Sequence, residues 1–275
     1  MTARRAMLAA TPAVALLLVL FAAPVAGMVV GSFRARDGAF PSLELYQLLA
    51  TQDLFVRVFA ETIALGLAVT AICLVLGLPL AWAYVRGGAA TRNVLLFAVA
   101  APLLISMVVR VYGWTILLGP GGLLDHVFEA FGVLDPPRLM YNMTGVIIGM
   151  VHVFLPFMVL TLVSSLVRID LRLYESAAIL GAGWWRTHRT VTVPLIRPGI
   201  VAGSVLVFAL TQGAFVTPLV LGGTAVKVTA TLVYTDIFVL FDWPRATAMA
   251  TVLLVAVLGI VVVQSRVGRP AWMTR

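Results

Sequence analysis

Residues 139–167 read LMYNMTGVIIGMVHVFLPFMVLTLVSSLV, a run with no Asp, Glu, Lys or Arg. About 20 apolar residues in a helix are enough to cross the hydrocarbon core of a bilayer. The chain has five more charge-free runs, at 6–33, 62–85, 93–109, 198–226 and 246–265. The run 93–109 is shorter than the others, but its apolar pattern continues past Arg110 to Leu118. The sequence therefore predicts an all-α integral membrane protein with six transmembrane helices.

The composition agrees with a membrane location. Of the 275 residues, 62% are hydrophobic and only 11% are charged, whereas soluble domains carry about 25% charged residues. The formal charge of +8 is scattered between apolar runs and forms no basic stripe, so we expect no nucleic-acid partner. Cys73 is the one cysteine of the sequence, which excludes an intramolecular disulfide and a cysteine-based zinc site. We predict no metal site.

The first apolar run has two interpretations. Arg4 and Arg5 precede it, and residues 22–27 read AAPVAG, which is similar to a signal-peptide cleavage site. However, no charge occurs from Ala6 to Phe33, and this length is sufficient to span a membrane. We favour a retained first helix over a cleaved signal peptide.

Basic residues indicate the orientation. Six spans put both ends of the chain on one side of the membrane. With both termini in the cytoplasm, twelve of the 19 basic residues lie in cytoplasmic segments and nine of the 11 acidic residues lie outside. Cytoplasmic loops carry an excess of Lys and Arg. The expected protein is therefore multi-pass in the inner membrane, with one domain over 1–275 that contains an N-terminal helix 6–33, core helices 55–265 and a long cytoplasmic loop 168–197.

The cytoplasmic loop is the most informative part of the chain. Residues 174–200 read YESAAILGAGWWRTHRTVTVPLIRPGI. Small residues recur at helical spacing in its first half and would let another protein surface approach closely. The second half is amphipathic and typical of a membrane interface, with the side chains of Trp184, Trp185, Arg186, His188 and Arg189. On spacing alone, two interpretations are equally favoured: an ordinary amphipathic connector between two spans, or a segment that contacts another protein.

This loop resembles the EAA loop in permease subunits of bacterial ABC importers. The EAA pattern is E-A-A, three residues, G, nine residues, I, any residue, L-P, and the residues at matching spacing are Glu175, Ala177, Gly181 and Pro194. The departures are Ser176, Val191 and Val193, which replace alanine, isoleucine and leucine. The stretches 117–120, 145–162, 203–223 and 242–244 are also similar to the spermidine/putrescine permease group, near its PotB-type subunit. The resemblance extends from residue 55 onward.

The resemblance implies the type I ABC importer permease fold (MetI-like) and a transport function. In such importers two permease subunits pair in the membrane and two copies of an ATPase subunit dock beneath them. A periplasmic binding protein delivers the solute. The resemblance further implies that the second permease is a distinct, PotC-like subunit and that ATP and Mg bind to the ATPase. In agreement, this sequence contains no G-x-x-x-x-G-K-[ST] phosphate loop, so we expect no enzyme, no catalytic residue and no cofactor in this chain; lipid is its other partner.

The resemblance assigns coupling to the ATPase to the EAA loop, with Glu175 as a charged anchor and Gly181 as a close-contact turn. The expected coupling residues are Tyr174, Glu175, Ser176, Ala177, Ala178, Gly181, Ala182, Trp185 and Pro194. We expect His152, which lies inside a span, to be a hydrogen-bonded packing residue rather than a relay or a ligand.

Acidic and aromatic residues near the outer ends of the spans are candidates for the substrate path. Carboxylates and aromatic faces both attract ammonium groups, which fits a polyamine such as spermidine or putrescine. The candidates are Glu61, Tyr234, Asp236, Phe241, Asp242 and Trp243. The alternative is that the acids pair with Arg57, Arg110 or Arg245, or face water.

Three other functions remain open. The solute of the importer could be an amino acid, an opine or a phosphonate, because the binding protein usually sets selectivity. A secondary transporter would need acidic or histidine relays within its spans and an inverted repeat; apart from His152, the six runs contain no such group. A membrane scaffold would give no reason for the EAA spacing.

Overall fold

The computed structural model describes residues 3–133 and 137–267, and every regular element in these ranges is helical. This confirms the all-α prediction. In chain order the α-helices are α1 (Ala3–Gly31), α2 (Glu44–Thr51), α3 (Asp53–Arg86), α4 (Ala89–Leu104), α5 (Met107–Leu118), α6 (Leu123–Ala130), α7 (Met143–Leu166), α8 (Arg172–Ile179), α9 (Trp184–Thr187), α10 (Val193–Gly213), α11 (Thr229–Phe238) and α12 (Trp243–Val267). Two π-helical turns, η1 (His188–Thr192) and η2 (Pro218–Gly222), precede and follow α10.

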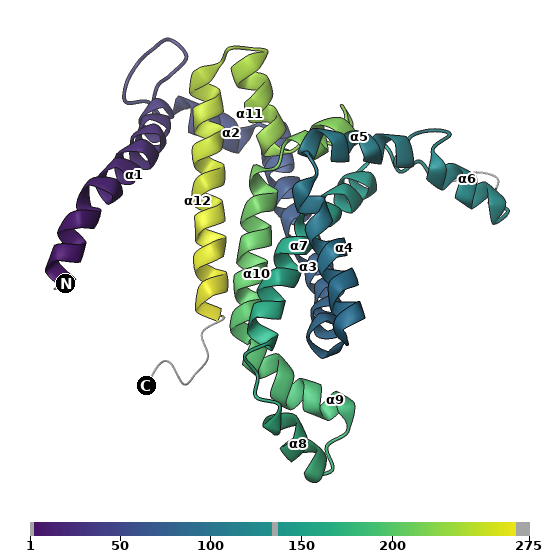
Figure 1. Ribbon diagram of the computed structural model, residues 1–275. Helices are drawn as coiled ribbons and strands as arrows, with labels where there is room; N and C mark the ends of the chain where they lie inside the picture. Colours follow the sequence, from purple (N-terminus) through teal and green to yellow (C-terminus); the bar gives the residue numbers. More distant parts are fainter. Residues whose placement is uncertain (1–2, 134–136, 268–275) are drawn as a thin grey trace.

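Three long helices form the centre of the molecule. Helices α3, α7 and α10 pack against one another, and α12 and α4 lie beside them (Figure 1). Close packing relies on glycine at Gly77 and Gly203, where an added Cβ would lie 3.0 Å and 2.7 Å from the side chain of Met158. Small residues let helices approach in membranes, where apolar burial alone gives little drive for association. The buried centre includes Val69, Met150, Met158, Leu162 and Val207.

The predicted spans correspond to helices of sufficient length with two exceptions. Five helical stretches are long and apolar enough to cross a membrane: Asp53–Arg86, Met107–Ala130, Met143–Leu166, Trp184–Gly213 and Trp243–Arg266. Among the residues whose side chains the structure describes, the stretch Ala15–Gly31 of α1 and helix α4, Ala89–Leu104, are shorter apolar helices. Each of the six charge-free runs lies in one of these seven helices or overlaps it.

The third predicted span is interrupted. Instead of one helix that continues to Leu118, α4 ends at Leu104 and α5 begins at Met107, with Ile105 extended between them (φ −85°, ψ 134°). Pro102 lies in the last turn of α4 and cannot donate a backbone hydrogen bond. The carbonyl that the break frees at Ile105 accepts a hydrogen bond from Nη2 of Arg110 at 2.9 Å. Arg110 therefore supports the break rather than merely extending toward the interface.

The fifth predicted span begins earlier and ends earlier than the run 198–226. The helix starts at Trp184, passes through η1 and ends at Gly213, where Ala214 is extended. In η1 the N–H of Val193 donates to the carbonyl of His188, a π-type bond. This wider turn lies directly before Pro194, which lacks a donor. Pro194 is therefore accommodated inside a continuous helix.

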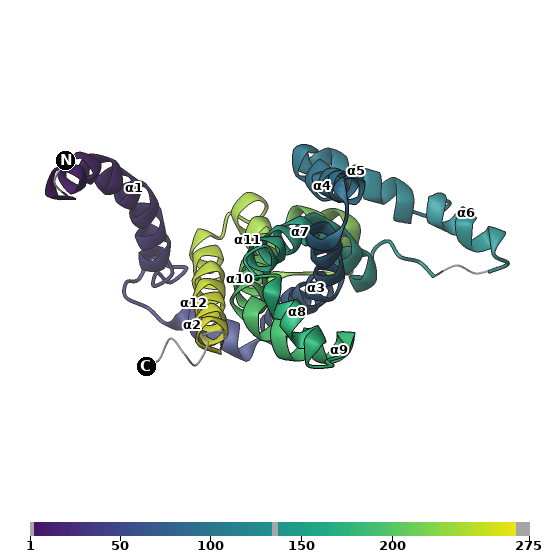
Figure 2. The ribbon, with the colours of Figure 1, turned by 60° about the horizontal axis from the view of Figure 1, so that its bottom comes forward.

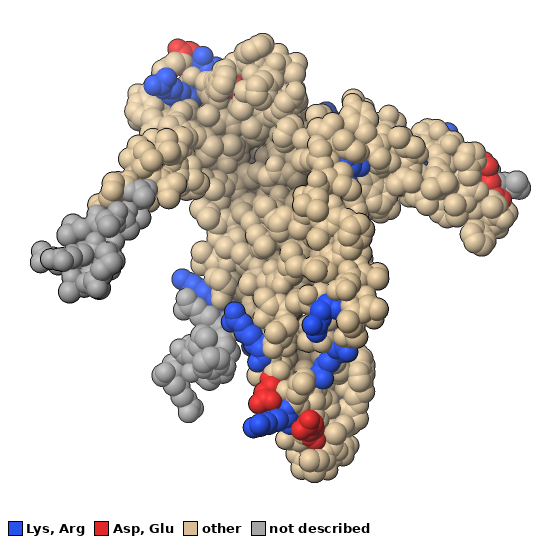
Figure 3. All heavy atoms as spheres, viewed as in Figure 1, with Lys and Arg blue, Asp and Glu red and all other residues tan. Residues whose placement is uncertain are grey.

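The outer elements project from the centre. Helix α1 leans away on one side, while α5 and α6 extend on the other (Figures 1 and 2). Helix α1 contacts α12, but large apolar side chains of α1 such as Leu17 and Phe21 are exposed. On the face shown in Figure 3, charged side chains gather toward the two ends and leave an uncharged band between them. Such a band fits a bilayer.

Candidate functional site

Helices α8 and α9 form the end of the molecule at the bottom of Figure 1. Every residue in α8 is at least partly exposed, and none is buried. Large apolar side chains are among the most exposed of the chain there: Ile179 is 85% exposed and Leu180 is 84% exposed. The expected coupling residues Glu175, Ser176 and Ala178 are exposed beside them. Exposed apolar surface of this kind is typical of a contact site for another protein.

Gly181 ends α8 through its backbone. Its φ is +72°, in the left-handed region that favours glycine. The N–H of Gly181 donates to the carbonyl of Ala178 at 2.9 Å, and the N–H of Ala182 donates to the carbonyl of Ala177 at 3.0 Å. These two bonds make a Schellman motif, which satisfies carbonyls at a helix end. Among the described residues, no atom outside its two chain neighbours lies within 4 Å of an added Cβ, so the turn needs glycine for its conformation and not for a contact with these residues.

Tyr174 points back toward the centre instead of outward. Its hydroxyl hydrogen-bonds that of Thr192 at 3.2 Å. The guanidinium of Arg86, the last residue of α3, lies 4.1 Å from the centroid of the Tyr174 ring, and the ring of Trp82 is 5.8 Å away. Tyr174 thus attaches α8 to the end of α3.

The remaining expected coupling residues lie in the next helical segment. Trp185 is 72% exposed and stacks on Trp184, with 5.7 Å between the ring centroids. Pro194 is the second residue of α10 and is exposed. The loop 168–197 therefore divides into an exposed surface on α8 and α9 and an inward contact at Tyr174.

Among the expected substrate-path acids, Glu61 has a local partner. Its carboxylate accepts a hydrogen bond from Nε of Arg57 at 2.8 Å, one helical turn earlier in α3. The pairing with Arg57, one of the alternatives left open by the sequence, is therefore the one that the structure shows.

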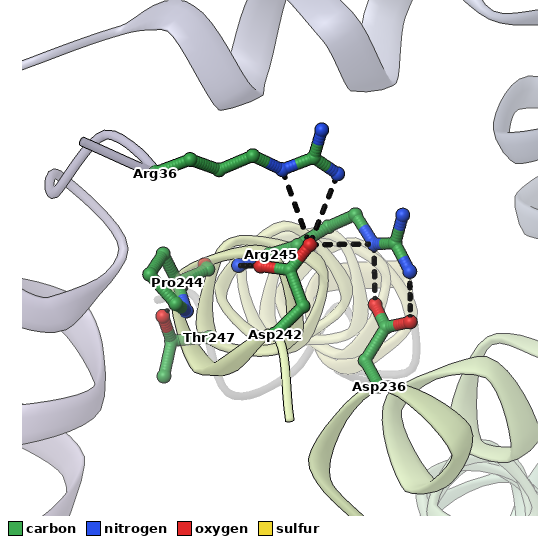
Figure 4. A network of polar contacts seen from close by, with 6 residues as sticks. All are labelled: Arg36, Asp236, Asp242, Pro244, Arg245 and Thr247. Carbon is green, nitrogen blue, oxygen red and sulfur yellow. Dashed lines mark hydrogen bonds and ion pairs between the residues drawn. The ribbon is translucent and has the colours of Figure 1, made fainter. Parts of the chain in front are cut away.

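Asp236 and Asp242 belong to a network of four charged residues (Figure 4). Nε of Arg245 donates to Asp236 at 2.8 Å, and Nη2 of the same guanidinium donates to its other carboxylate oxygen. Arg245 also lies 3.6 Å from Asp242. Arg36 donates to Asp242 from Nη2 at 3.0 Å and from Nε at 3.2 Å. The two formal positive charges balance the two negative ones, so the network leaves no unpaired carboxylate for an incoming cation.

Of the aromatic candidates, Tyr234 is half-buried and the other two are exposed. Tyr234 stacks between Phe215, at 5.4 Å, and Phe238, at 5.0 Å. Phe241 and Trp243 are 71% and 57% exposed. The structure therefore brings Asp236, Asp242 and Tyr234 onto neighbouring parts of α11 and α12 but does not gather all six candidates around one cavity.

Arg110, which the sequence offered as a partner for the acids, forms no ion pair with them in the described part of the chain. The Nε atom of Arg110 is buried and has no hydrogen-bond partner within residues 3–133 and 137–267. Arg110 lines a cavity of about 340 Å³ whose lining also includes Phe154, Gly213 and Ala214, so the cavity adjoins the ends of α4 and α10. Unwound helices at membrane depth form substrate sites in other transporters. The sequence signal was the single arginine inside the apolar run 93–118.

Two polar side chains in the spans are mostly satisfied. Nε1 of Trp114 donates to Nδ1 of His152 at 3.2 Å, in agreement with the expected packing role of His152. Gln212 is 2% exposed; its Nε2 lies 3.5 Å from the carbonyl of Thr62, while its Oε1 has no partner in the described part of the chain. Within the same residues, no group of three or more His, Cys, Asp or Glu could hold a metal ion.

Comparison with known proteins places this architecture among transport proteins. The family model for the inner membrane component of binding-protein-dependent transport systems matches residues 74–266. The chain is 35% identical over 243 residues to the spermidine/putrescine transport system permease protein PotB of Salmonella typhimurium (strain SL1344), covering 86% of this chain and 84% of the relative. It is 34% identical to the corresponding PotB of Escherichia coli (strain K12), covering 86% of this chain and 88% of the relative.

A solved structure has the same fold. A chain of a bacterial ABC transporter involved in the import of the acidic polysaccharide alginate superposes with a TM-score of 0.79. The match covers 98% of this chain and 96% of that one, at 21% sequence identity. The likeness supports the ABC importer permease fold that the EAA loop implied.

Proposed function

Because the chain belongs to the family of binding-protein-dependent transport system inner membrane components, we propose that it forms one half of the membrane path of a polyamine importer and transmits the work of a separate ATPase to that path. The observation that carries the coupling role is the exposed apolar end of α8, shaped by the Schellman turn at Gly181. Two copies of the ATPase would bind ATP and Mg.

The ATPase contact would consist of the outward residues of the loop. Glu175, Ser176, Ala177 and Ala178 line α8, Gly181 and Ala182 close it, and Trp185 with Pro194 continues the surface. An ATPase groove that receives α8 would cover the exposed side chains of Ile179 and Leu180. Burial of apolar surface at about 25 cal/mol per Å² favours such docking.

Coupling also needs a mechanical connection to the spans. Tyr174 links α8 to Trp82 and Arg86 at the end of α3 and to Thr192 before α10. Movement of α8 by the ATPase would therefore reach two of the three central helices. ATP-driven closure of the ATPase pair would shift the spans between inward-facing and outward-facing states, a two-state element biased by a ligand elsewhere.

The solute is proposed from the relatives and from local chemistry. The PotB proteins similar to this chain are named for spermidine and putrescine transport. Carboxylates and aromatic rings that suit ammonium groups lie near the ends of the spans, at Glu61, Tyr234, Asp236, Phe241, Asp242 and Trp243. Since the acids are already paired with arginines, a polyamine would have to exchange with Arg57, Arg36 or Arg245.

A second candidate solute is anionic, such as a phosphonate, an opine or an amino acid carboxylate. The observation in its favour is Arg110, whose Nε lacks a partner in a cavity between two helix ends. A guanidinium at membrane depth that has no carboxylate partner in the described residues would bind a carboxylate or phosphonate and repel a polyamine.

The assembly proposed for this chain follows the family. A periplasmic binding protein would deliver solute, and a distinct PotC-like permease would form the other half of the path in the inner membrane, with both termini of this chain cytoplasmic. Lipid would surround the uncharged band, and the chain itself would bind no nucleotide.

The test is ATPase activity of the complete complex in lipid nanodiscs with its binding protein, titrated in parallel with spermidine, putrescine and a phosphonate. Stimulation by a polyamine supports the first solute and stimulation by the phosphonate the second. A complex that purifies without any ATPase subunit would overturn the coupling role.

A further inference from the structure

An apolar groove lies between the end of α3 and the helix that begins at Trp184. Its volume is about 350 Å³ and its lining is almost entirely apolar. Helix α3 contributes Pro79 and α7 contributes its last residue, Leu166. The other apolar walls include Leu78, Trp82, Trp184, Trp185, Val193 and Ile196.

Cationic side chains border this groove. Arg189 lines the groove itself and is exposed, and no carboxylate of the described ranges forms an ion pair with it. An adjoining hollow of about 220 Å³ shares Trp82 with the groove and is lined by Arg86 and Arg92. The surroundings therefore combine an apolar slot with positive charge at its edge.

The wall of the groove also holds a polar atom without a partner. The ring of His188 lies between Trp82, at a centroid distance of 4.3 Å, and Trp184, at 4.1 Å. Its Nδ1 lies 2.9 Å from the carbonyl oxygen of Trp184; since a carbonyl only accepts, Nδ1 carries the proton. Its Nε2 is buried and has no hydrogen-bond partner in the described part of the chain. Buried polar atoms are normally paired, so an unpaired one points to a missing ligand.

The position of the groove identifies that ligand. Leu78, Pro79 and Leu166 belong to helices that are long and apolar enough to span the bilayer, and tryptophans such as Trp184 and Trp185 concentrate at membrane interfaces. A slot that is apolar inside and cationic at its edge complements a lipid with a hydrocarbon chain and an anionic headgroup.

We propose that this groove binds an anionic phospholipid from the leaflet next to α8 and α9. An acyl chain fills the slot between α3 and α10. The phosphate pairs with Arg189, which lines the groove. The bound lipid then lies between Trp82 of α3 and Trp184 of α9, so it joins the coupling segment to the spans in addition to the contact at Tyr174.

Native mass spectrometry of the purified full chain tests this proposal directly. The chain is incubated with phosphatidylglycerol or with phosphatidylcholine of the same acyl chains, and retained lipid is counted on intact protein ions. We expect the wild-type chain to retain phosphatidylglycerol in preference to phosphatidylcholine. Replacement Arg189→Gln should weaken phosphatidylglycerol retention by about fivefold, the effect of one arginine near anionic lipid, and leave phosphatidylcholine unchanged.

The matched control is Arg266→Gln, in the last turn of α12. It removes the same charge outside the groove and should not alter retention. Val193→Trp should fill the slot and reduce retention of both lipids; Leu78→Phe serves the same purpose if Val193→Trp does not fold. Equal retention of the two lipids by the wild-type chain, equal losses in the two arginine variants, or full retention in a slot-filled variant would each overturn the proposal. The measurement involves neither solute nor ATPase, so its outcome is independent of the proposed transport function.

Discussion

Asp242 accepts two hydrogen bonds from Arg36, a residue 206 positions earlier in the chain. This contact ties the segment after α1 to the start of α12. The same carboxylate lies near Arg245, which in turn pairs with the buried Asp236. The network therefore joins the segment after α1, helix α11 and the start of α12 at one end of the molecule (Figure 4).

Loss of the buried member of this network should cost more than loss of the exposed one. We expect Asp236→Asn to destabilise the chain by about 3 kcal/mol, because the guanidinium of Arg245 would lose its bidentate carboxylate partner in a largely buried site. Arg36 is half exposed, so Arg36→Gln should cost at most about 1 kcal/mol. Thermal unfolding of both variants in detergent gives the comparison. Equal losses of stability in the two variants would show that the buried pair of Asp236 and Arg245 contributes no more than the exposed contact of Arg36.

The conformation of Gly181 predicts a graded series of variants. Gly181→Val places a β-branched residue at φ +72°, and a left-handed residue costs roughly 1–2 kcal/mol for side chains other than glycine and asparagine. We expect the end of α8 to fray, which is measured as faster amide hydrogen exchange there. Solute uptake should be lost, with membrane insertion intact. Gly181→Asn, which tolerates this conformation, should retain much of the uptake. If Gly181→Val and Gly181→Asn reduce uptake equally, the added side-chain bulk and not the left-handed turn is the cause of the loss.

Tyr174 offers a way to separate ATP hydrolysis from transport. Tyr174→Phe removes only the hydrogen bond to Thr192, worth about 1 kcal/mol, and keeps the ring against Arg86 and Trp82. Tyr174→Ala removes the ring as well. We expect the complex with Tyr174→Ala to hydrolyse ATP without transporting solute, while Tyr174→Phe does both. Parallel ATPase and uptake measurements on reconstituted complexes decide this; coupled activity in Tyr174→Ala would contradict the connecting role of the ring.

A glycine pair tests how tightly the central helices pack. An added Cβ at Gly66 in α3 would collide with Nε2 of Gln212 and lie 3.0 Å from Phe208, both in α10. Gly66→Ala should therefore destabilise the chain by about 1–3 kcal/mol. Gly259→Ala in α12 meets open space and should be neutral or slightly stabilising, since alanine is the better helix former. Unfolding midpoints compare the two, and an unchanged midpoint for Gly66→Ala would refute the close approach of α3 and α10.

Charge spacing and one motif were sufficient to predict the helical class and the approximate location of the spans; the coupling role of the loop 168–197 stays a prediction. They could not predict the helix ends at Leu104 and Gly213, because the apolar pattern continues across both. Hydrophobicity reports where lipid or packing surrounds the chain, but a break depends on local backbone geometry and on which side chain, such as Arg110, satisfies a freed carbonyl.

The pairing of the acids was predicted only in part: the sequence offered Arg57 and Arg245 as partners, but not Arg36. Arg245 lies three residues after Asp242 and was a natural candidate, but the partner Arg36 belongs to a distant segment. The ring stack of Trp82, His188 and Trp184 likewise joins two segments about 100 residues apart. Contacts of this kind follow from tertiary packing and leave no periodic signal.

The helix that runs without interruption from Trp184 to Gly213 has a mechanical consequence. Its 30 residues form a rod about 45 Å long, with the interfacial tryptophans at one end and the cavity of Arg110 at the other. A small tilt or rotation at the tryptophan end would be delivered at the far end as a displacement of the unwound residues after Gly213. The π turn at His188–Thr192 is the one irregular stretch in this rod. Its stiffness therefore determines how much of a movement at Trp184 reaches Gly213.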